Sequence, residues 1–211
     1  MLHPFVFGTI ASTSVPAYVG PIDIVSSPLI ADSVTRSLSS TYMDDLFNVR
    51  ADRTGQPQQD IGQSNYLLDE SALTAFLSGD NGYIVTPYDQ SGNGYDSTQS
   101  SAASQPQIQA SLVGTKYGTI HAGSQYWAVN SSVSKANSDL FAYAVIDPQG
   151  SGKSFDSLLE LNSAGRLRLY DASSNPYVGY DNNSSTVNIA VRTNGPQVLS
   201  WLTDGATMYM Y

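Results

Sequence analysis

The chain has 211 residues, contains no cysteine and carries a formal net charge of −9. This acidity excludes a nucleic-acid backbone and an anionic membrane surface as partners, because both would repel it. The lack of cysteine excludes thiolate metal sites, a cysteine nucleophile and disulfides, and no apolar run approaches the ~20 residues that a membrane-spanning helix needs.

Residues 1–20 are expected to form an N-terminal arm, because two prolines and two glycines interrupt the segment repeatedly. The segment also lacks the cationic region and the unbroken apolar stretch of a signal peptide. Its aromatic and aliphatic side chains need burial, either against the rest of the same chain or on a neighbouring subunit. Residues 21–211 are then expected to form a single domain.

A first short helix is predicted in SPLIADSVTRSL, residues 27–38. Ile30, Val34 and Leu38 recur there at every fourth position, which is the spacing of one helical face. Pro28 suits the first turn of such a helix. We expect this segment to pack on the domain as an amphipathic helix.

A second short helix is predicted in LDESALTAFLSG, residues 68–79. Asp69 is placed to cap its N-terminus, and Gly79 suits its end. Apolar residues at helical spacing would form a buried stripe between these two positions. The stripe consists of Leu73, Phe76 and Leu77.

After Gly82 the hydrophobic pattern changes to the period of two residues that is typical of β-strands. Ten short segments show it: YIVTPY, PQIQAS, YGTIHA, YWAVN, DLFAYAVID, SLLEL, RLRLY, TVNIAV, QVLSWL and TMYMY. Two hairpins are predicted, one across NSAG at 162–165 and one across TDGA at 203–206, where Asp204-Gly205 is a turn signal. The pattern predicts an all-β sandwich or jelly roll, with the two short helices packed in its N-terminal half.

The last predicted strand, residues 207–211, alternates fully and has no polar stop. Such a strand would leave an open sheet edge, which proteins usually cover. Either another chain pairs with it, or a further segment of a longer chain does.

The stretch YDQSGNGYDSTQ, residues 88–99, places an oxygen-bearing side chain at every second position and then a glycine. The candidate calcium ligands are Asp89, Ser91, Asn93 and Asp96. The bidentate glutamate of an EF-hand loop is missing, because position 12 is Ser100. The other alternative is a turn network, in which the same side chains bond nearby backbone amides.

Tyrosine is abundant in this chain, with 14 residues. Tyrosine rings beside Asn and Asp can hold sugars, since the ring stacks on the apolar sugar face while the polar groups bind hydroxyls. The candidate ligand-binding residues are Tyr88, Tyr95, Tyr177, Tyr180, Asp181 and Asn182. Ordinary β-sheet packing, which also favours tyrosine, is the alternative.

Catalytic patterns are weak in this sequence. Only two glutamates occur, Glu70 and Glu160, and no spacing singles out an aspartate to complete a two-carboxylate glycosidase site. GSGKS at 150–154 lacks the upstream glycine of a phosphate-binding loop. His3 and His121 are far apart, and no serine lies in a nucleophile-elbow context. We expect no catalytic residue and no cofactor other than the calcium considered above.

Five segments carry a family resemblance: GPIDIVSS, ADSVTRSLSSTY, LFNVRADRTGQPQQDIG, LDESALTAFLSGDNGYIVTPYDQSGNGYDSTQ and QPQI. In this order they resemble the catalytic domain of arabinofuranosidase B-type enzymes, and the related concanavalin A-like domains of phage and bacterial surface proteins. The likeness covers residues 20–110, and YDQSGNG with the upstream DIG is its most specific part. It implies a concanavalin A-like jelly roll.

The resemblance does not extend to catalytic residues. The strand that holds the nucleophilic glutamate of these enzymes corresponds to RLRLY, residues 166–170, which has no carboxylate, and their acid aspartate would fall beyond Tyr211. The phage-type relatives therefore imply a virion structural protein of a tail, baseplate or capsid, without enzyme activity. Its expected partners are other virion proteins, further copies of itself and host cell-surface glycans. The alternative is an α-L-arabinofuranosidase that uses Glu160 and an aspartate.

Overall fold

A computed structural model describes residues 17–121 and 125–129 and, from residue 140 on, the backbone of seven strands. The earlier strands are β1 (Phe47–Ala51), β2 (Gln58–Ile61), β3 (Gln63–Ser64), β4 (Leu67–Leu68), β5 (Gly82–Pro87), β6 (Ser97–Thr98), β7 (Gln107–Val113), β8 (Lys116–Ile120) and β9 (Ala128–Val129). The later strands are β10 (Leu140–Ile146), β11 (Asp156–Leu161), β12 (Gly165–Ala172), β13 (Asn175–Asp181), β14 (Thr186–Ala190), β15 (Gln197–Thr203) and β16 (Met208–Met210).

The described part contains one α-helix, α1 (Glu70–Leu77), and one short 3-10 helix, Ala102–Ser104. Neither is long and apolar enough to cross a membrane. All other described elements are strands, so the all-β class predicted from the sequence is confirmed.

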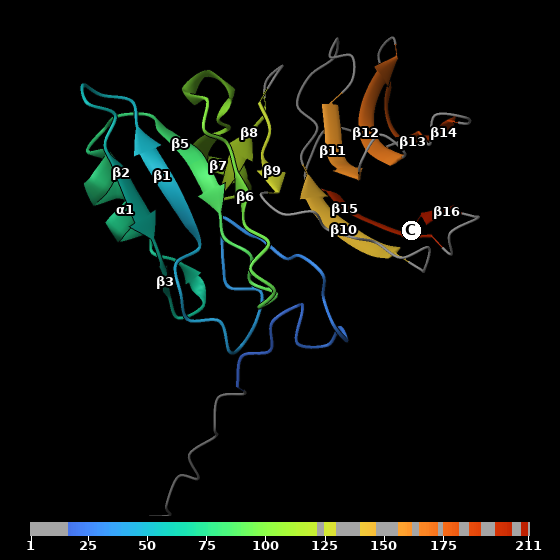
Figure 1. Cartoon of the computed structure of the whole chain (residues 1–211), viewed down its shortest axis with the longest axis horizontal. Helices are drawn as coiled ribbons and strands as arrows, with labels where there is room; N and C mark the ends of the chain where they lie inside the picture. The colour runs from blue at the N-terminus through green and yellow to red at the C-terminus, as the bar shows by residue number, and fades with distance from the viewer. Residues whose placement is uncertain are drawn as a thin grey trace, which may run out of the picture.

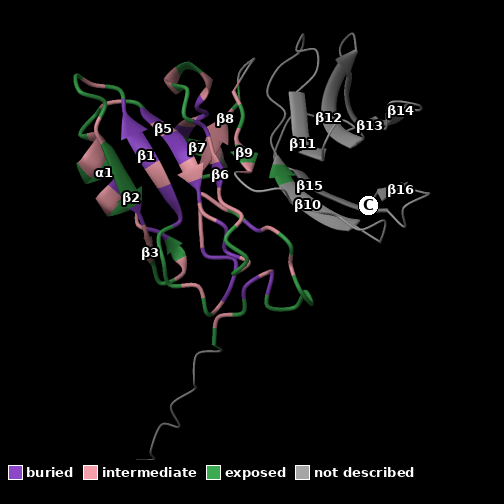
Figure 2. Ribbon diagram, in the orientation of Figure 1, coloured by how far each residue is buried: buried purple, intermediate pink, exposed green. Residues whose placement is uncertain are grey.

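The first part of the chain is built on a five-stranded antiparallel sheet in the order β2-β1-β5-β7-β8 (Figure 1). Phe47 of β1 lies opposite Ile61 of β2, and Val49 lies opposite Ile84 of β5. Figure 2 shows that buried residues concentrate in β1 and β5. The centre of this sheet therefore carries the buried side chains, and its edges carry the exposed ones.

The later strands form two further antiparallel sheets, in the orders β10-β15-β16 and β11-β12-β13-β14. Leu161 lies opposite Gly165, and Thr203 lies opposite Met208, so both predicted hairpins are confirmed. The loop residues between these pairs lie mostly outside the described residues. Among the described strands β16 is at the edge of its sheet.

Six strands, β1, β2, β3, β4, β6 and β13, were not predicted from the sequence, and the three longest of them show why. β1 reads FNVRA, in which an arginine interrupts the apolar pattern, and β2 reads QQDI, which is almost wholly polar and exposed. β13 reads NPYVGYD and contains proline and glycine, both uncommon inside strands. Each of the three is held by the strands beside it, so pairing outweighed the local composition.

The hydrophobic core joins the five-stranded sheet to α1. Its buried members are Leu46, Phe47, Val49, Ile61, Leu68, Leu73, Ile84 and Ile108. Leu73 supplies the buried position of α1, with Phe76 and Leu77 partly buried against the same cluster. The apolar stripe predicted for this helix is therefore confirmed.

The ends of α1 also follow the sequence prediction. Asp69 Oδ1 accepts the backbone N–H of Ala72 at 2.9 Å, which satisfies one of the free donors of the first turn. The helix ends where Ser78 takes the left-handed conformation, and Gly79 follows with φ of +95°.

The first helix predicted from the sequence, at residues 27–38, is wrong. The backbone N–H of Ala31 donates to the Asp89 carboxylate, and that of Leu38 donates to the Gln90 side chain. These bonds to a distant turn occupy backbone N–H groups that a helix would use for its own hydrogen bonds. Leu38 is still buried, so the apolar pattern reflects burial in an extended segment and not a helical face.

Tyr18 and Gly20 attach the end of the expected N-terminal arm to the domain. The ring of Tyr18 stacks on Tyr66 with centroids 4.2 Å apart, and its hydroxyl accepts a hydrogen bond from Arg36 at 2.8 Å. Gly20 passes so close to Leu38 that a Cβ would lie 2.0 Å from the Leu38 carbonyl oxygen. The rest of the arm lies outside the described residues.

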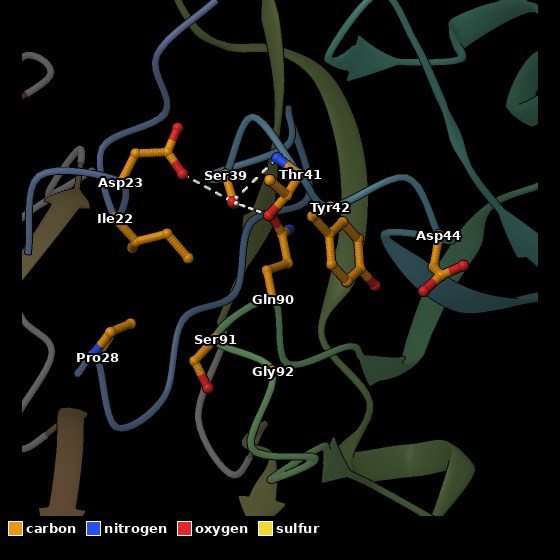
Figure 3. Close-up of a pocket in the computed structure, with 10 residues that line it drawn as sticks. All are labelled: Ile22, Asp23, Pro28, Ser39, Thr41, Tyr42, Asp44, Gln90, Ser91 and Gly92. Carbon is orange, nitrogen blue, oxygen red and sulfur yellow. Dashed lines mark hydrogen bonds between the residues drawn. The ribbon is translucent and has the colours of Figure 1, made fainter. Parts of the chain in front are cut away.

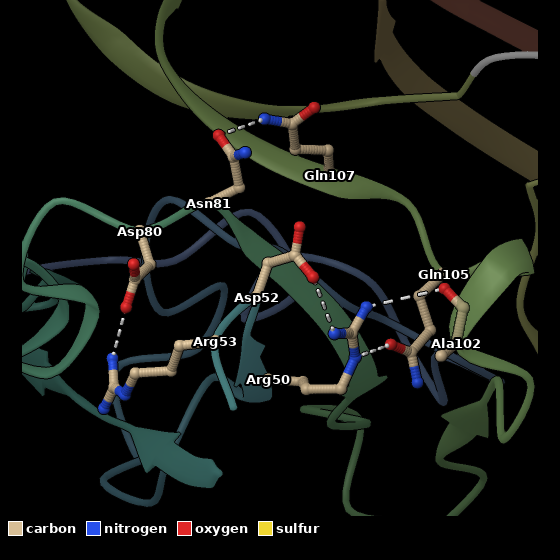
Figure 4. Close-up of polar contacts among 8 residues, drawn as sticks. All are labelled: Arg50, Asp52, Arg53, Asp80, Asn81, Ala102, Gln105 and Gln107. Atoms are coloured by element: carbon tan, nitrogen blue, oxygen red, sulfur yellow. Dashed lines mark hydrogen bonds and ion pairs between the residues drawn. The ribbon is translucent and has the colours of Figure 1, made fainter. Parts of the chain in front are cut away.

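Arg50 is a buried cation in β1 (Figure 4). Its Nε donates to the Gln105 side chain at 2.7 Å, and its guanidinium lies 4.7 Å from the ring centroid of Tyr83. The Asp52 carboxylate approaches Nη1 at 3.6 Å. A buried charge is tolerated only with such partners, so these contacts fix the side chain in one position.

We expect Arg50→Lys to lower the free energy of unfolding by about 2–4 kcal/mol, because lysine cannot bond Gln105 and stack on Tyr83 as the planar guanidinium does. The matched variant Arg53→Lys should cost under about 1 kcal/mol, because the side chains of its ion pair with Asp80 are 36% and 33% exposed. Urea unfolding of both variants measures the difference. Equal losses would contradict a special role for Arg50.

Candidate binding site

The turn that follows β5 is organised around the Asp89 carboxylate. Oδ1 accepts the backbone N–H groups of Ala31 at 3.0 Å and Ser91 at 2.9 Å. Oδ2 accepts the Ser91 hydroxyl at 2.8 Å and the backbone N–H of Tyr95 at 3.0 Å. The N–H of Asp89 itself donates to Asp96 at 2.8 Å.

These hydrogen bonds form the turn network that was one of the two alternatives for this stretch. The oxygens that calcium would need already face N–H dipoles, which repel a cation. Within the described ranges no group of three or more His, Asp or Glu is arranged to hold a metal. Gly92 and Gly94 adopt φ of +86° and +72°, a conformation that other residues resist.

The same turn holds the segment before β1. The side-chain oxygen of Gln90 accepts the backbone N–H of Leu38 at 2.6 Å, and Gln90 is almost fully buried. The Asn93 amide donates to the carbonyls of Pro28 at 2.8 Å and Leu29 at 3.0 Å. Residues 88–96 therefore act as a clasp that fixes an irregular segment of more than ten residues.

A hollow of about 330 Å³ lies where the clasp meets this segment (Figure 3). In Figure 3, Ile22 and Asp23 lie on one side of it, Tyr42 and Asp44 on the other, and Gln90 and Ser91 between them. The lining residues are Ile22, Asp23, Pro28, Ser39, Thr41, Tyr42, Asp44, Gln90, Ser91 and Gly92.

Three polar side chains on one wall of the hollow form a chain of hydrogen bonds. Asp23 Oδ1 accepts the Ser39 hydroxyl at 2.8 Å, and the Ser39 and Thr41 hydroxyls lie 3.0 Å apart. Asp23 Oδ2 accepts the backbone N–H of Gly20 at 2.7 Å. The Gly20 and Ser39 bonds lower the pKa of Asp23 to about 2, so this carboxylate stays ionised at neutral pH.

The opposite wall carries Tyr42 and Asp44. Tyr42 packs against the hydrophobic core, and its hydroxyl donates to the carbonyl of Asp45 at 2.5 Å, so the ring is held in place. Asp44 is exposed, and no side chain or backbone group among the described residues bonds its carboxylate. Asp44 and the Thr41 hydroxyl are therefore the groups best placed to bind a polar ligand.

The structure distributes the residues predicted as ligand-binding over separate places. Tyr88 donates to Asp60 at 2.6 Å and does not line the hollow. Tyr95 contributes its backbone N–H to the clasp. Of the calcium and sugar candidates, Ser91 lines the hollow, whereas Asp89, Asn93 and Asp96 build the turn behind it.

The remaining sugar candidates belong to β13, which the strand pattern had not predicted. Tyr177 and Tyr180 are three residues apart in this strand, so their positions belong to opposite faces of the sheet. Asp181 ends the strand and shares a face with position 177, while Asn182 lies outside the described residues. Position 180 therefore lies on the opposite face of the strand from positions 177 and 181, and the sugar-binding role of these residues stays a prediction.

Sequence reasoning missed most of the hollow, including Asp23, Thr41, Tyr42 and Asp44. These residues occur in an irregular segment with no periodicity, and only their contact with the clasp brings them together. The one available signal was the resemblance of GPIDIVSS and ADSVTRSLSSTY to a known family, which extends over this segment.

Comparison with known proteins supports the fold. No family model and no curated protein matches the chain. Three solved structures are similar: an arabinofuranosidase complexed with arabinofuranosyl-α-1,2-xylobiose (17% identity, TM-score 0.66), a GH54 α-L-arabinofuranosidase soaked with a cyclic sulfate inhibitor (16%, 0.65), and a Glu-to-Gln mutant of a GH54 α-L-arabinofuranosidase soaked with 4-nitrophenyl α-L-arabinofuranoside (15%, 0.67).

Each similarity covers 86% of this chain and 47% of the other, so the chain spans about half the length of these enzymes. The fold of the chain is a concanavalin A-like β-sandwich. This confirms the fold that the sequence resemblance implied. At 15–17% identity this similarity shows the fold of the chain and nothing about its activity.

Burial opposes the ionisation of Asp89, but the N–H groups of Ser91, Tyr95 and Ala31 outweigh it and hold the pKa of the carboxyl below its ordinary value of 3.8. Because the pKa is lowered in the folded state, the clasp contributes its full stability above that value and loses it as pH falls through the lower folded pKa.

We expect Asp89→Asn to destabilise the domain by about 3 kcal/mol at neutral pH, because the new amide sets N–H donors against N–H donors. The difference from wild type should shrink as pH falls below 3.8 and through the lowered folded pKa of Asp89. Urea unfolding across this pH range measures both effects. Asp44→Asn, at an exposed carboxylate without a described bond, is the control and should unfold like wild type; a pH-independent loss in Asp89→Asn would contradict the clasp.

Proposed function

We propose that this chain is a carbohydrate-binding domain without hydrolase activity, carried on the surface of a phage particle. The observation that supports it best is the polar hollow beside the clasp. It has the dimensions of a site for one sugar unit, since ligand pockets begin at about 300 Å³. It combines the fixed Tyr42 ring, the Asp44 carboxylate, which no described group bonds, and the Thr41 hydroxyl, which shares one hydrogen bond with Ser39 and keeps capacity for a second.

The chemistry of the hollow favours binding over hydrolysis. A glycosidase needs one carboxyl group that is protonated at working pH to serve as the general acid. Asp23 cannot serve in this way, because its pKa of about 2 keeps it ionised. Its two oxygens are also engaged by Gly20, Ser39 and Ser40.

The assignment to a phage particle rests on the sequence resemblance to phage relatives and on the low content of charged residues, 13%. In such a particle the arm and the edge strand β16 would pair with other virion proteins or with further copies of the chain. Immunogold labelling of purified particles with an antibody to this chain tests the location. Particles without label, from cells that express the chain, would overturn it.

We expect the full-length chain to bind at least one neutral monosaccharide in a titration monitored by NMR, with shifted signals from residues that line the hollow. Thr41→Val should weaken this binding about fivefold, because it removes one sugar-facing hydroxyl without changing the side-chain volume. Thr54→Val changes an equally exposed threonine in the β1–β2 turn and should bind like wild type. An unchanged affinity in Thr41→Val, or the failure of every sugar to bind, would contradict the proposal.

A second candidate function is α-L-arabinofuranosidase, which the names of the similar structures favour. Glu160 would be its catalytic residue. In register, Glu160 of β11 lies opposite Arg166 of β12, which lies opposite Asp181 of β13. The two acidic positions are therefore two strand spacings apart, about 10 Å, with the position of Arg166 between them.

Under the non-catalytic proposal, the chain should release no nitrophenol from 4-nitrophenyl α-L-arabinofuranoside above the rate in buffer. Turnover that disappears in Glu160→Gln but persists in Glu70→Gln would establish the hydrolase instead. Glu70 is the matched control, because it is the only other glutamate of the chain and begins α1 away from the later strands.

A further inference from the structure

We propose that the hollow selects its glycan by charge, admitting neutral sugars and amino sugars and excluding uronic acids and sialic acids. This inference rests on the proposed function and names the class of ligand for the same site. It follows from the charges on and around the lining, which are all negative among the described residues.

Two carboxylates, Asp23 and Asp44, line the hollow, and none of the ten lining residues is basic. Asp23 is held in its ionised form by hydrogen bonds from Gly20 and Ser39. Asp44 stands on the opposite wall (Figure 3), so a ligand between the walls meets a negative charge on each side.

Further carboxylates surround the same place. Burial first, and then the charges of Asp44 and Asp96, raise the pKa of the Tyr42 phenol on the hollow wall. Burial and the neighbouring charges of Asp60 and Asp44 likewise raise the pKa of Asp45. The carboxylates are therefore close enough to act on one another and on the ring that a sugar would contact.

The arginines of the described part are engaged elsewhere, and Lys116 lies in β8 outside the lining of the hollow. Arg50 pairs with Asp52, and Arg53 pairs with Asp80, on the sheet and beside α1. Arg36 donates to the Tyr18 hydroxyl. None of these side chains lines the hollow, so the carboxylates there keep their charge uncompensated by lining residues.

The selection follows from like-charge repulsion. A sugar carboxylate placed between Asp23 and Asp44 would lie in the same hollow as both charges, and salt screens repulsion incompletely at separations below the Debye length of about 8 Å. A neutral sugar of the same ring shape donates a hydroxyl to Asp44, whose carboxylate no described group bonds, and an ammonium group gains attraction. Rejection of the wrong ligand by repulsion is a common source of specificity.

The test uses two matched series that differ only in charge: glucose, glucosamine and glucuronic acid, and galactose, galactosamine and galacturonic acid. Each is titrated into the full chain at about pH 6, where the amines are protonated and the acids ionised. We expect the acid of a series to bind about tenfold or more weaker than its neutral member, and the amino sugar to bind at least as well. The difference should shrink at high salt.

Asp44→Asn should reduce the preference for the neutral over the acidic sugar about threefold or more, because it removes one of the two lining charges. Glu70→Gln changes the net charge by the same amount outside the hollow and should leave the preference unchanged. If acid and neutral sugars bind equally, the charge selection fails and the proposed function stands. If no member of either series binds, the proposed function and the selection both fail.

Discussion

The ionised carboxylate of Asp89 is the constraint on which the described half of this protein depends. It accepts four hydrogen bonds, from Ala31, Tyr95 and both the N–H and the hydroxyl of Ser91. Three of these donors are backbone amides that would otherwise lack partners in an irregular segment, where each unsatisfied buried group costs about 1–3 kcal/mol. One short turn thereby stabilises two stretches that are far apart in the sequence.

The hollow is a consequence of this arrangement. The segment before β1 has no helix or sheet of its own to fix its path, apart from a single bridge between Arg36 and Leu67. Gln90 holds this segment at Leu38, and the nearby residues Ser39 to Asp44 then form the polar walls. Because the clasp fixes the segment that forms both walls, and Ser39 bonds the Thr41 hydroxyl, Thr41 and Asp44 are held in place before any ligand binds.

The sequence predicted features that depend on local chemistry and missed those that depend on distant partners. The cap at Asp69 and the stripe of α1 follow from neighbouring residues, and both were confirmed. The spacing of Ile30, Val34 and Leu38 also matched one face of a helix. However, the side chains of Asp89 and Gln90 accept backbone N–H groups that this helix would have used for its own hydrogen bonds. The burial of Arg50 was missed for the same reason, since its partners Gln105 and Tyr83 are far along the chain.

The polar residues of the clasp stand out in the sequence but serve the fold. Asp89, Gln90 and Asn93 stand out in the sequence as ligands would, yet their polar atoms are engaged within the protein. A side chain with all its bonding capacity used internally is constrained by the fold and has little left for a substrate. Such a turn can therefore occur in hydrolases and in binding proteins alike, because its side chains serve the fold. The similarity of fold to arabinofuranosidases is therefore compatible with the binding function proposed above.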